Sequence, residues 1–342
     1  MTEKLNRGKC IFRFSNSRLL IQEVRQIFDE PYNNVIFILV MKNANAKMTL
    51  AKHDEFLHVV EDVIKSKKII GIERISEFTE SCFELFPDEI STLFPFIPDL
   101  LDYCHKPSTA YMFKHYINMN DAKPEILDYL LDHNRYDILN ELDEDSEFLE
   151  SPSVVWKAIN DQKTIENWRF LSLLAKSQPQ LPNLLELVSD AIAKIEIGDT
   201  LTTVHTHNDE VFTMNQVFAL NFITEIIYGN PICVTVVDLD LLFSLISKIL
   251  TKFKKNTFAM KAISDFLKVS FIKKETQAYF HEKIFPILFS FFEKDENSEE
   301  RIIIGIFADC IQSLISEDCT LNDILPETVK KKFDEYSKLT HI

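Results

Sequence analysis

Apolar residues recur at helical spacing along the last third of the chain. From Leu242 to Phe253 they fall at i, i+3, i+4, i+7, i+8 and i+11, which is one face of an amphipathic helix. Asn256 follows a short basic run and is placed to cap the next helix. Three further apolar faces come after it, over residues 259–270, 280–291 and 303–314. The pattern predicts two consecutive helical hairpins, with Phe266 in the seam between them.

These hairpins are expected to belong to a repeat. Their first helices begin near Asp238 and Glu275, a spacing of under forty residues, and HEAT and armadillo units repeat at about 40–47 residues. Residues 93–97, LFPFI, resemble residues 284–288, IFPIL, although two unrelated proline bends would give the same similarity. Asn297 and Glu300 have the spacing of a capping box at the start of the last helix.

The N-terminal two thirds show helical spacing less regularly, with prolines at the junctions between segments. Residues 196–214 are a long irregular stretch with Gly198, several threonines and a polar HTHNDE run. We therefore expect an N-terminal helical array over 1–195, an irregular loop over 196–214 and C-terminal helical hairpins over 215–342 that continue the array. The helices predicted in the first part are Arg18–Phe28, Asn34–Met41, Leu50–Lys65, Ile69–Leu85, Glu89–Tyr103, Thr109–Asn118, Pro124–Leu131, Asp137–Leu142, Ser153–Ile159, Thr164–Lys176 and Leu184–Ile195.

The glycine content supports a helical fold. Only five glycines occur in 342 residues, against an average usage of roughly 7%. Glycine supplies the positive φ of tight turns and of phosphate-binding loops, so a large β-sandwich, a Rossmann crossover or a P-loop is not expected. The predicted fold is all-α, a HEAT/armadillo-like solenoid of stacked helical hairpins.

Charge and cysteine usage narrow the class of partner. The net charge of −16 repels nucleic acid and anionic lipid and favours basic partners. The basic runs 252–255 and 330–332 read as solvated helix ends. No apolar run approaches the roughly 18 residues of a membrane span, and residues 1–10 lack a signal-peptide pattern. The six cysteines sit mostly in apolar helical patterns, as buried free thiols do, so we expect a reducing compartment, the cytoplasm or the nucleus.

Two sets of residues could carry chemistry. His205, His207, Asp209 and Glu210 are all metal-ligand types, but their spacing matches no zinc motif, and a solvated polar loop is the favoured interpretation. Cys104 and His105 are adjacent in sequence, and adjacent residues point to different faces of a helix, which disfavours a nucleophilic pair. We therefore assign no catalytic, cofactor-binding or metal-binding residues.

A third feature is a run of carboxylates. Six acidic residues lie between Glu141 and Glu150, where a solvated linker is favoured over a docking surface for a basic partner. The 28 phenylalanines fall mostly at helical spacing and are expected in the core. They lack the interleaved Lys and Arg of a base-stacking surface.

Several short segments occur in one order along residues 11–225. They are IFRF at 11–14 followed by Asn16 and Ser17, MKNANAK at 41–47, HDEFL at 53–57, ERIS at 73–76, LFPFI at 93–97, KPEILDYL at 123–130 and NQVFAL at 215–220. This order resembles the SAPS-domain family, the regulatory subunits of Sit-type Ser/Thr phosphatases. Members typically open with F-W-R-F and later carry C-K-x-x-N-x-K-L, E-I-L-S, K-P-x-E-M-L-x-Y-L and an N-A-S-x-x-L helix. Ile11, Met41 and Arg74 depart from that pattern.

The resemblance implies a non-catalytic regulatory or scaffold subunit that binds a type-2A-like Ser/Thr protein phosphatase catalytic subunit. The matched residues Phe14, Ile75 and Leu127 are expected in the core, so the resemblance identifies no protein-binding residues. Two alternatives stay open. One is a general HEAT/armadillo adaptor in transport or cytoskeletal assembly, and the other is a helical enzyme whose site forms from residues far apart in the sequence.

Overall fold

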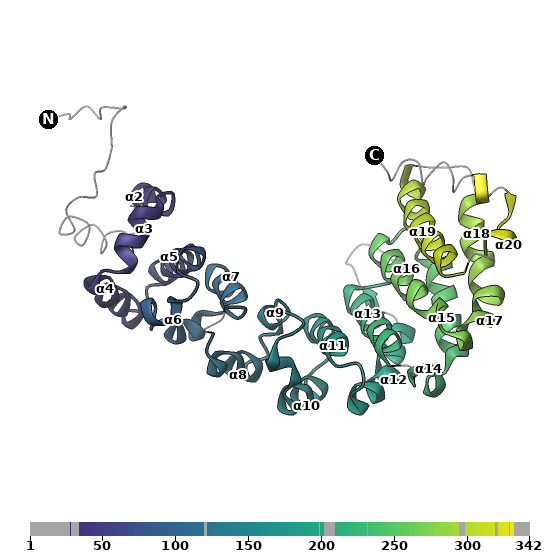
Figure 1. The fold of residues 1–342 in the computed structure, drawn as a ribbon, viewed down its shortest axis with the longest axis horizontal. Coiled ribbons are helices and arrows are strands. Elements are labelled where there is room, and N and C mark those ends of the chain that lie inside the picture. The colour runs from purple at the N-terminus through teal and green to yellow at the C-terminus, as the bar shows by residue number, and fades with distance from the viewer. Residues whose placement is uncertain are drawn as a thin grey trace. The chain divides into compact units, whose positions relative to one another are not determined.

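The computed structural model describes residue 28 and residues 34–119, 122–197, 199–201, 209–230, 232–293, 298–318, 321–327 and 329–331. Residue contacts divide the chain into unit 1, Met1–Asp143, and unit 2, Glu144–Ile342. Helices make up nearly all of the regular structure in both described units (Figure 1), which confirms the all-α prediction. No helix among the described residues combines the length and the apolar content that a membrane span requires.

Unit 1 is built from short helices and 3₁₀ turns, none longer than 12 residues in its described part. Side chains cap some of them, as where Asn43 accepts a hydrogen bond from the Ala46 N–H at 3.1 Å. In chain order the elements are α2 (Asn34–Met41), α3 (Ala44–Ala51), α4 (Asp54–Lys65), α5 (Ile69–Glu80), η1 (Phe83–Leu85), α6 (Ile90–Leu93), η2 (Ile97–Tyr103), α7 (Pro107–Tyr116), α8 (Pro124–Asp132) and α9 (Tyr136–Leu139).

An aromatic cluster forms much of the core of unit 1. Phe78 lies 5.2 Å from Phe56, 6.1 Å from Phe28 and 6.4 Å from Phe94, measured between ring centroids. Most of these ring pairs meet edge to face or tilted, the arrangement that the ring quadrupole favours. Gly71 lets α5 approach this core closely, because an added Cβ would lie 2.5 Å from the carbonyl oxygen of Phe28.

Three helices predicted in unit 1 are broken in the structure. The helix expected over 69–85 ends at Glu80 and is followed by the 3₁₀ segment η1. The helix expected over 50–65 is divided into α3 and α4, because His53 caps α4 by accepting from the Glu55 N–H at 3.2 Å. The helix expected over 89–103 ends at Leu93 and resumes as the 3₁₀ segment η2. Pro95 lacks the N–H that would continue the helix and clashes with the preceding turn.

Unit 2 contains the longer helices, of up to 20 residues in α19. In chain order its elements are η3 (Glu147–Glu150), α10 (Pro152–Asn160), α11 (Ile165–Ser177), α12 (Pro182–Ile197), β1 (Asp199–Leu201), β2 (Asp209–Val211), α13 (Met214–Gly229), α14 (Cys233–Val236), α15 (Leu239–Lys252), α16 (Thr257–Phe271), η4 (Lys274–Thr276), α17 (Gln277–Tyr279), the π-helical turn η5 (Phe280–Ile284), α18 (Phe285–Glu293), α19 (Ser298–Glu317) and α20 (Leu321–Ile324).

The long helices of unit 2 pack in sequence. α13 packs against α11, α12 and α16, and α16 packs in turn against α15 and α19. Figure 1 shows α11, α13, α16 and α19 following one another. Phe266 of α16 is fully buried, with its ring centroid 5.6 Å from that of Phe243 on α15. Phe266 is therefore buried, as predicted, and this ring contact is with the other helix of its own hairpin; its place in the seam between the two hairpins stays a prediction.

The segment 196–214 differs from the irregular loop that the sequence predicts. α12 continues to Ile197, and β1 and β2 pair antiparallel with Thr200 opposite Glu210. Because α12 and α13 pack against each other, their connection lies inside unit 2. Residue contacts place the division of the chain between Asp143 and Glu144 instead.

The C-terminal helical faces largely follow the predicted pattern. Asn256 caps α16 by accepting from the Ala259 N–H at 3.1 Å, as predicted. The face predicted over residues 280–291 differs at its end: Phe292 is buried there, whereas Phe291 is partly exposed. The predicted helix Arg18–Phe28, apart from Phe28, and the capping residue Asn297 lie outside the described residues.

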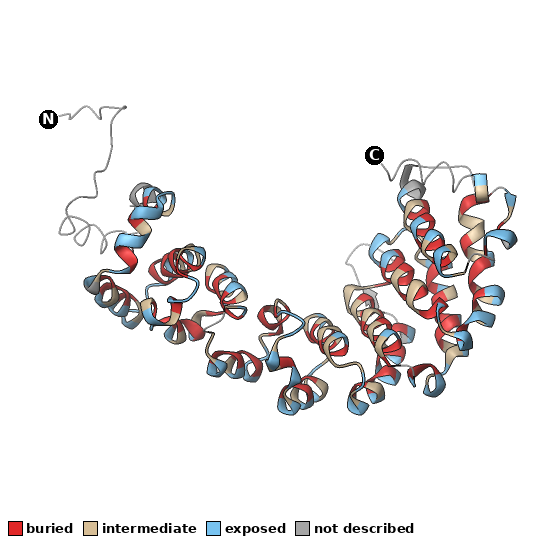
Figure 2. Cartoon of the chain, in the orientation of Figure 1, coloured by how far each residue is buried: buried red, intermediate tan, exposed pale blue. Residues whose placement is uncertain are grey.

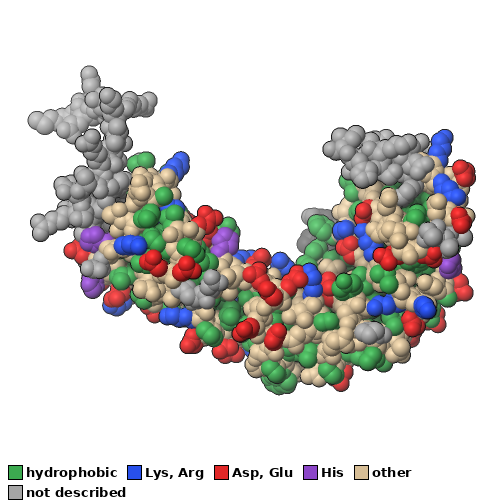
Figure 3. Space-filling view, viewed as in Figure 1, with side chains coloured by type: hydrophobic (Ala, Val, Ile, Leu, Met, Phe, Trp, Pro, Cys, Tyr) green, Lys and Arg blue, Asp and Glu red, His purple; other side chains and the backbone are tan. Residues whose placement is uncertain are grey.

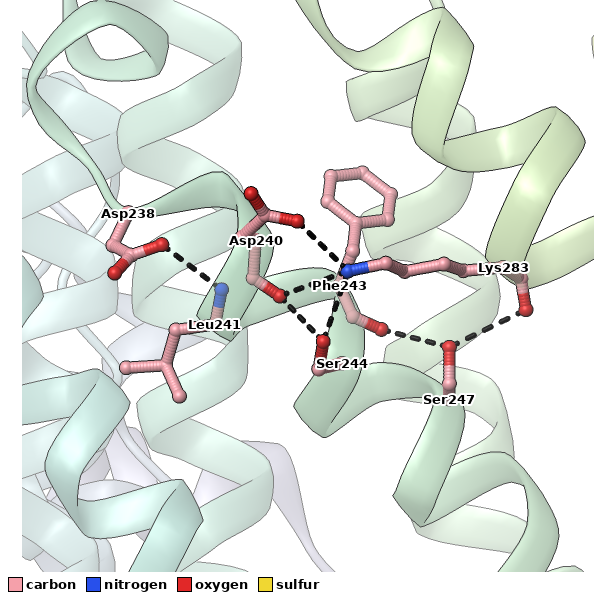
Figure 4. Close-up of polar contacts among 7 residues, drawn as sticks. All are labelled: Asp238, Asp240, Leu241, Phe243, Ser244, Ser247 and Lys283. Carbon is pink, nitrogen blue, oxygen red and sulfur yellow. Dashed lines mark hydrogen bonds and ion pairs between the residues drawn. The ribbon is translucent and has the colours of Figure 1, made fainter.

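A π-helical turn precedes Pro286 in the third of these faces. Pro286 has no N–H for an α-helical bond, and residues Phe280–Ile284 form a π-helical turn. Ser247 of α15 donates to the carbonyl oxygen of Lys283 at 3.3 Å, and the Lys283 ammonium lies 3.0 Å from Asp240 (Figure 4). Contacts with α15 therefore hold the altered turn in place.

Candidate functional site

The metal-type residues of the sequence are only partly described. His205 and His207 lie outside the described residues, and Asp209 and Glu210 belong to β2. In the part of the chain that the structure describes, no three His, Cys, Asp or Glu residues are grouped as metal ligands. Asp209 and Glu210 therefore lie in a strand rather than in the expected loop, and the interpretation of His205 and His207 as part of a solvated polar loop stays a prediction.

The described cysteines are buried free thiols, as the sequence predicts: Cys82, Cys104, Cys233 and Cys310. Burial raises the pKa of Cys82, Cys233 and Cys310 to about 12. Since the thiolate is the nucleophilic form, these side chains are poorly suited to covalent catalysis. Cys10 and Cys319 lie outside the described residues.

Cys104 and His105 contact different partners. Nη1 of Arg135 lies 2.7 Å from the Cys104 sulfur, and burial nevertheless raises the pKa of this thiol. Nδ1 of His105 lies 3.2 Å from the carbonyl oxygen of Asp102, within its own turn.

The run of carboxylates spans the division between the units. In unit 1, Glu141 lies 3.8 Å from the Lys114 ammonium, and the main-chain N–H of Asp143 donates to Asn118 at 3.1 Å. In unit 2, Glu144 forms an ion pair with Lys176. Exposed pairs of this kind contribute about 0–1 kcal/mol, so they add little to stability.

In unit 2, four helices each leave a narrow stripe of side chains outside the core (Figure 2). Neighbouring members of a stripe are three or four residues apart, so each stripe is one side of its helix. We call the combined surface the α11–α19 face. Its residues are Ile165, Arg169, Leu173 and Lys176 on α11, Phe218, Asn221, Glu225 and Tyr228 on α13, Phe258, Lys261, Asp265, Lys268 and Ile272 on or directly after α16, and Ile302, Gly305 and Asp309 on α19.

Side-chain contacts join these stripes to one another. Ser172 of α11 donates to the carbonyl oxygen of Phe218 on α13 at 3.3 Å. Lys268 of α16 lies 2.5 Å from the carboxylate of Asp309 on α19. Figure 3 shows basic, acidic and apolar side chains intermingled on the visible side of unit 2.

The α11–α19 face carries large apolar side chains toward its helix ends. Near the N-terminal ends, Ile165, Phe258 and Ile302 are 40%, 64% and 59% exposed. Near the C-terminal ends, Tyr228 and Ile272 are 67% and 53% exposed. Large apolar side chains beside polar ones are characteristic of protein-binding surfaces.

A pocket of 230 Å³ lies between these rows of apolar residues. It is smaller than the roughly 300–1,000 Å³ of small-molecule sites, and its size suits one side chain of a partner better than a metabolite. Its lining includes Arg169 and Lys176 of α11, Phe218, Asn221 and Glu225 of α13, and Asp265 of α16.

The charges in this pocket are unequally matched. Lys176 pairs with Glu144, and Asp265 lies 3.1 Å from the Lys261 ammonium. Glu225 has no hydrogen-bond or ion-pair partner among the described residues. Burial raises the pKa of the Glu225 carboxyl; the nearby carboxylates of Glu144 and Asp265 add to this effect, and Lys176 opposes it.

Unit 1 has a separate groove of 540 Å³. The Lys47 ammonium donates to the carbonyl oxygen of Ser81 at 3.0 Å, and Nδ1 of His115 lies 2.8 Å from the Glu80 carboxylate. Its further lining residues are Phe83, Glu84, Pro87 and Met119.

The family-like segments contain both buried and exposed positions where they are described. Ile75 and Leu127 are buried, as expected, whereas Phe14 lies outside the described residues. The segment 41–47 joins α2 to α3, and its Lys47 reaches the groove of unit 1. Sequence patterns identified neither the groove nor the pocket, since both depend on which helices are neighbours.

Comparison of the chain with family models and with curated proteins gives no match. Function is therefore inferred from the surface of the molecule and from the order of its short sequence segments.

Proposed function

We propose that this chain is a non-catalytic scaffold subunit that binds a type-2A-like Ser/Thr protein phosphatase catalytic subunit. In this proposal the helices form a HEAT/armadillo-like solenoid of stacked hairpins. The observation that carries the binding role is the α11–α19 face, on which four successively packed helices expose aligned stripes. The resemblance of residues 11–225 to the SAPS-domain family is the argument for a phosphatase as the partner.

The composition of the face suits a protein partner. Phe258 and Ile302 are more than half exposed, and burying one such side chain stabilises a complex by about 1.5–3 kcal/mol. The charged residues between them would form the polar part of an interface and orient the partner. A stack of helices offers an extended surface for such binding.

The described chemistry favours binding over catalysis. The described thiols are buried, and three have pKa values raised to about 12. The charged side chains of the face are largely engaged with one another, as in the pair Lys268–Asp309. We therefore expect the purified chain to hydrolyse no phosphoester by itself.

The proposal is tested with the full-length chain and a purified type-2A-like catalytic subunit. Affinity is measured by calorimetry for the wild type and for the double variant Phe258→Asp/Ile302→Asp. Both residues are exposed, so the fold should persist, and we expect binding to weaken at least about tenfold because hot-spot side chains cost 2 kcal/mol or more. The matched control is Val236→Asp on α14, which is 61% exposed outside this face.

Three results would contradict parts of the proposal. Absence of binding by the wild type would remove the phosphatase as partner and favour the general adaptor. Equal binding by the double variant would remove the α11–α19 face as the surface involved. Phosphatase activity of the purified chain alone would contradict its non-catalytic role.

A further inference from the structure

We propose that the 230 Å³ pocket of the α11–α19 face receives an arginine or lysine side chain of a bound protein segment, with Glu225 as its counter-ion and Asn221 hydrogen-bonded to the segment's main chain. The inference deepens the proposed function and rests on it in one respect, that this face binds protein. It does not require that the partner be a phosphatase.

The first argument is the state of Glu225. Its carboxylate is partly buried on α13 and has no hydrogen-bond or ion-pair partner among the described residues. A partly desolvated carboxylate without a partner is unfavourable, and its raised pKa reports this cost. A cation that enters the pocket would remove the cost by forming a charge-assisted hydrogen bond.

The second argument is that the other carboxylate and the lysine of the pocket are already paired. Lys176 is paired with Glu144, and Asp265 is paired with Lys261. Arg169, the other cation of the lining, is also engaged in an interaction within the described part of the chain. A negatively charged occupant would have to displace Glu144 and approach Glu225. A basic occupant meets a carboxylate that needs a partner, and the net charge of −16 attracts basic segments to the molecule.

The third argument is the rest of the lining. Asn221 lies one turn before Glu225 on α13 and forms no hydrogen bond within the described part of the chain. Its amide offers both a donor and an acceptor, which matches the N–H and C=O of a peptide group. Phe218, one turn further back, provides an apolar surface for the aliphatic stem or a ring face for a cation.

The probe is a capped pentapeptide, Ala-Ala-Arg-Ala-Ala, titrated into the ¹⁵N-labelled full-length chain. NMR follows the side-chain amide of Asn221, identified by its loss in Asn221→Ala. Peptides with Gln or Glu in the central position are the ligand controls. Glu225→Gln is the test variant, and Glu186→Gln on α12 makes the same charge change at an exposed site outside the pocket.

We expect the arginine peptide to shift the Asn221 amide in the wild type and in Glu186→Gln. In Glu225→Gln its affinity should fall about tenfold, as expected for loss of a charged hydrogen bond. The variant should retain or raise the thermal midpoint at about neutral pH, which separates loss of the site from loss of the fold.

Other outcomes overturn the inference. If the arginine peptide binds Glu225→Gln as tightly as it binds the wild type, Glu225 is not the counter-ion. If the glutamate peptide binds more tightly than the arginine peptide, the pocket takes an acidic side chain. No shift of the Asn221 amide in the wild type at millimolar peptide shows that the pocket does not take a basic side chain. If the arginine peptide binds but the phosphatase does not, the result supports this pocket as a basic side-chain site and contradicts only the proposed phosphatase partner.

Discussion

The two units form helical structure in different ways. In unit 1 the described helices are at most 12 residues long and alternate with 3₁₀ segments. In unit 2, α12 and α13 have 16 residues each and α19 has 20. Proline accounts for part of the difference, because Pro87, Pro95 and Pro98 lie within 12 residues of one another in unit 1 and interrupt helix formation there.

The difference shows what stabilises each unit. Helices shorter than about 12–15 residues are marginal on their own, so the short helices of unit 1 depend on tertiary packing around Phe56 and Phe78. The longer helices of unit 2 pack against one another along their lengths. Four of them, α11, α13, α16 and α19, each leave one continuous side outside the core, and these sides form the α11–α19 face.

The largest expected effect comes from truncating the buried rings. Phe78→Ala and Phe266→Ala should each lower the free energy of unfolding by about 3–5 kcal/mol, because both leave a cavity in a packed core. Hydrogen exchange should show the loss of protection concentrated in unit 1 for the first variant and in unit 2 for the second. The exposed Phe258→Ala is the control and should change stability by less than about 0.5 kcal/mol.

Uniform loss of protection in both variants would contradict separate stabilisation of the units. A small effect of Phe78→Ala alone would mean that the aromatic cluster contributes less than the comparison implies.

A second contrast concerns two helical glycines. Gly71→Ala should lower stability by about 1–3 kcal/mol, because its Cβ would lie 2.5 Å from the Phe28 carbonyl oxygen and 2.6 Å from Val63. Gly305→Ala in α19 meets nothing within 4 Å and should raise stability by about 0.5–1 kcal/mol. Urea unfolding measures the change in the free energy of unfolding for both variants. Changes of the same sign would contradict the close approach of α5 to Phe28.

The helix caps provide a third comparison. Asn256→Ala removes the cap of the 15-residue helix α16 and a 2.9 Å bond from Nδ2 to the Phe212 carbonyl oxygen. Asn43→Ala removes the cap of the 8-residue helix α3. Thermal denaturation should show a loss of about 1 kcal/mol in each case, with the larger loss for Asn256→Ala. A larger loss for Asn43→Ala would show that the shorter helix depends more on its cap.

The smallest expected effect is the pH dependence from Glu225. Its folded-state pKa is raised by burial and by the neighbouring carboxylates, against the opposing charge of Lys176. A raised carboxyl pKa stabilises the fold at low pH, and this contribution is lost as pH rises through the folded pKa. Glu225→Gln should therefore have the higher thermal midpoint at about pH 7, with a difference that narrows toward about pH 4. A lower midpoint at about pH 7 would indicate that Glu225 supports the fold.

Regular local patterns in the sequence identified many of the helices. The predicted range Asn34–Met41 coincides with α2, and Asn256 caps α16 as expected. Such features depend on residues within a few positions of one another, so the periodicity and the capping chemistry contain the information. The SAPS-like function stays a prediction, because its matched segments mix buried with exposed positions and define no binding site.

The remaining features depend on contacts between distant residues. The β1–β2 pairing and the close approach of Gly71 to Phe28 involve backbone geometry that hydrophobic periodicity does not specify. The pocket at Glu225 requires α11, α13 and α16 to be neighbours, although its lining residues span 169–265. The helical class of this protein followed from local spacing, whereas the surface that could bind a partner exists only through the packing of helices far apart in the chain.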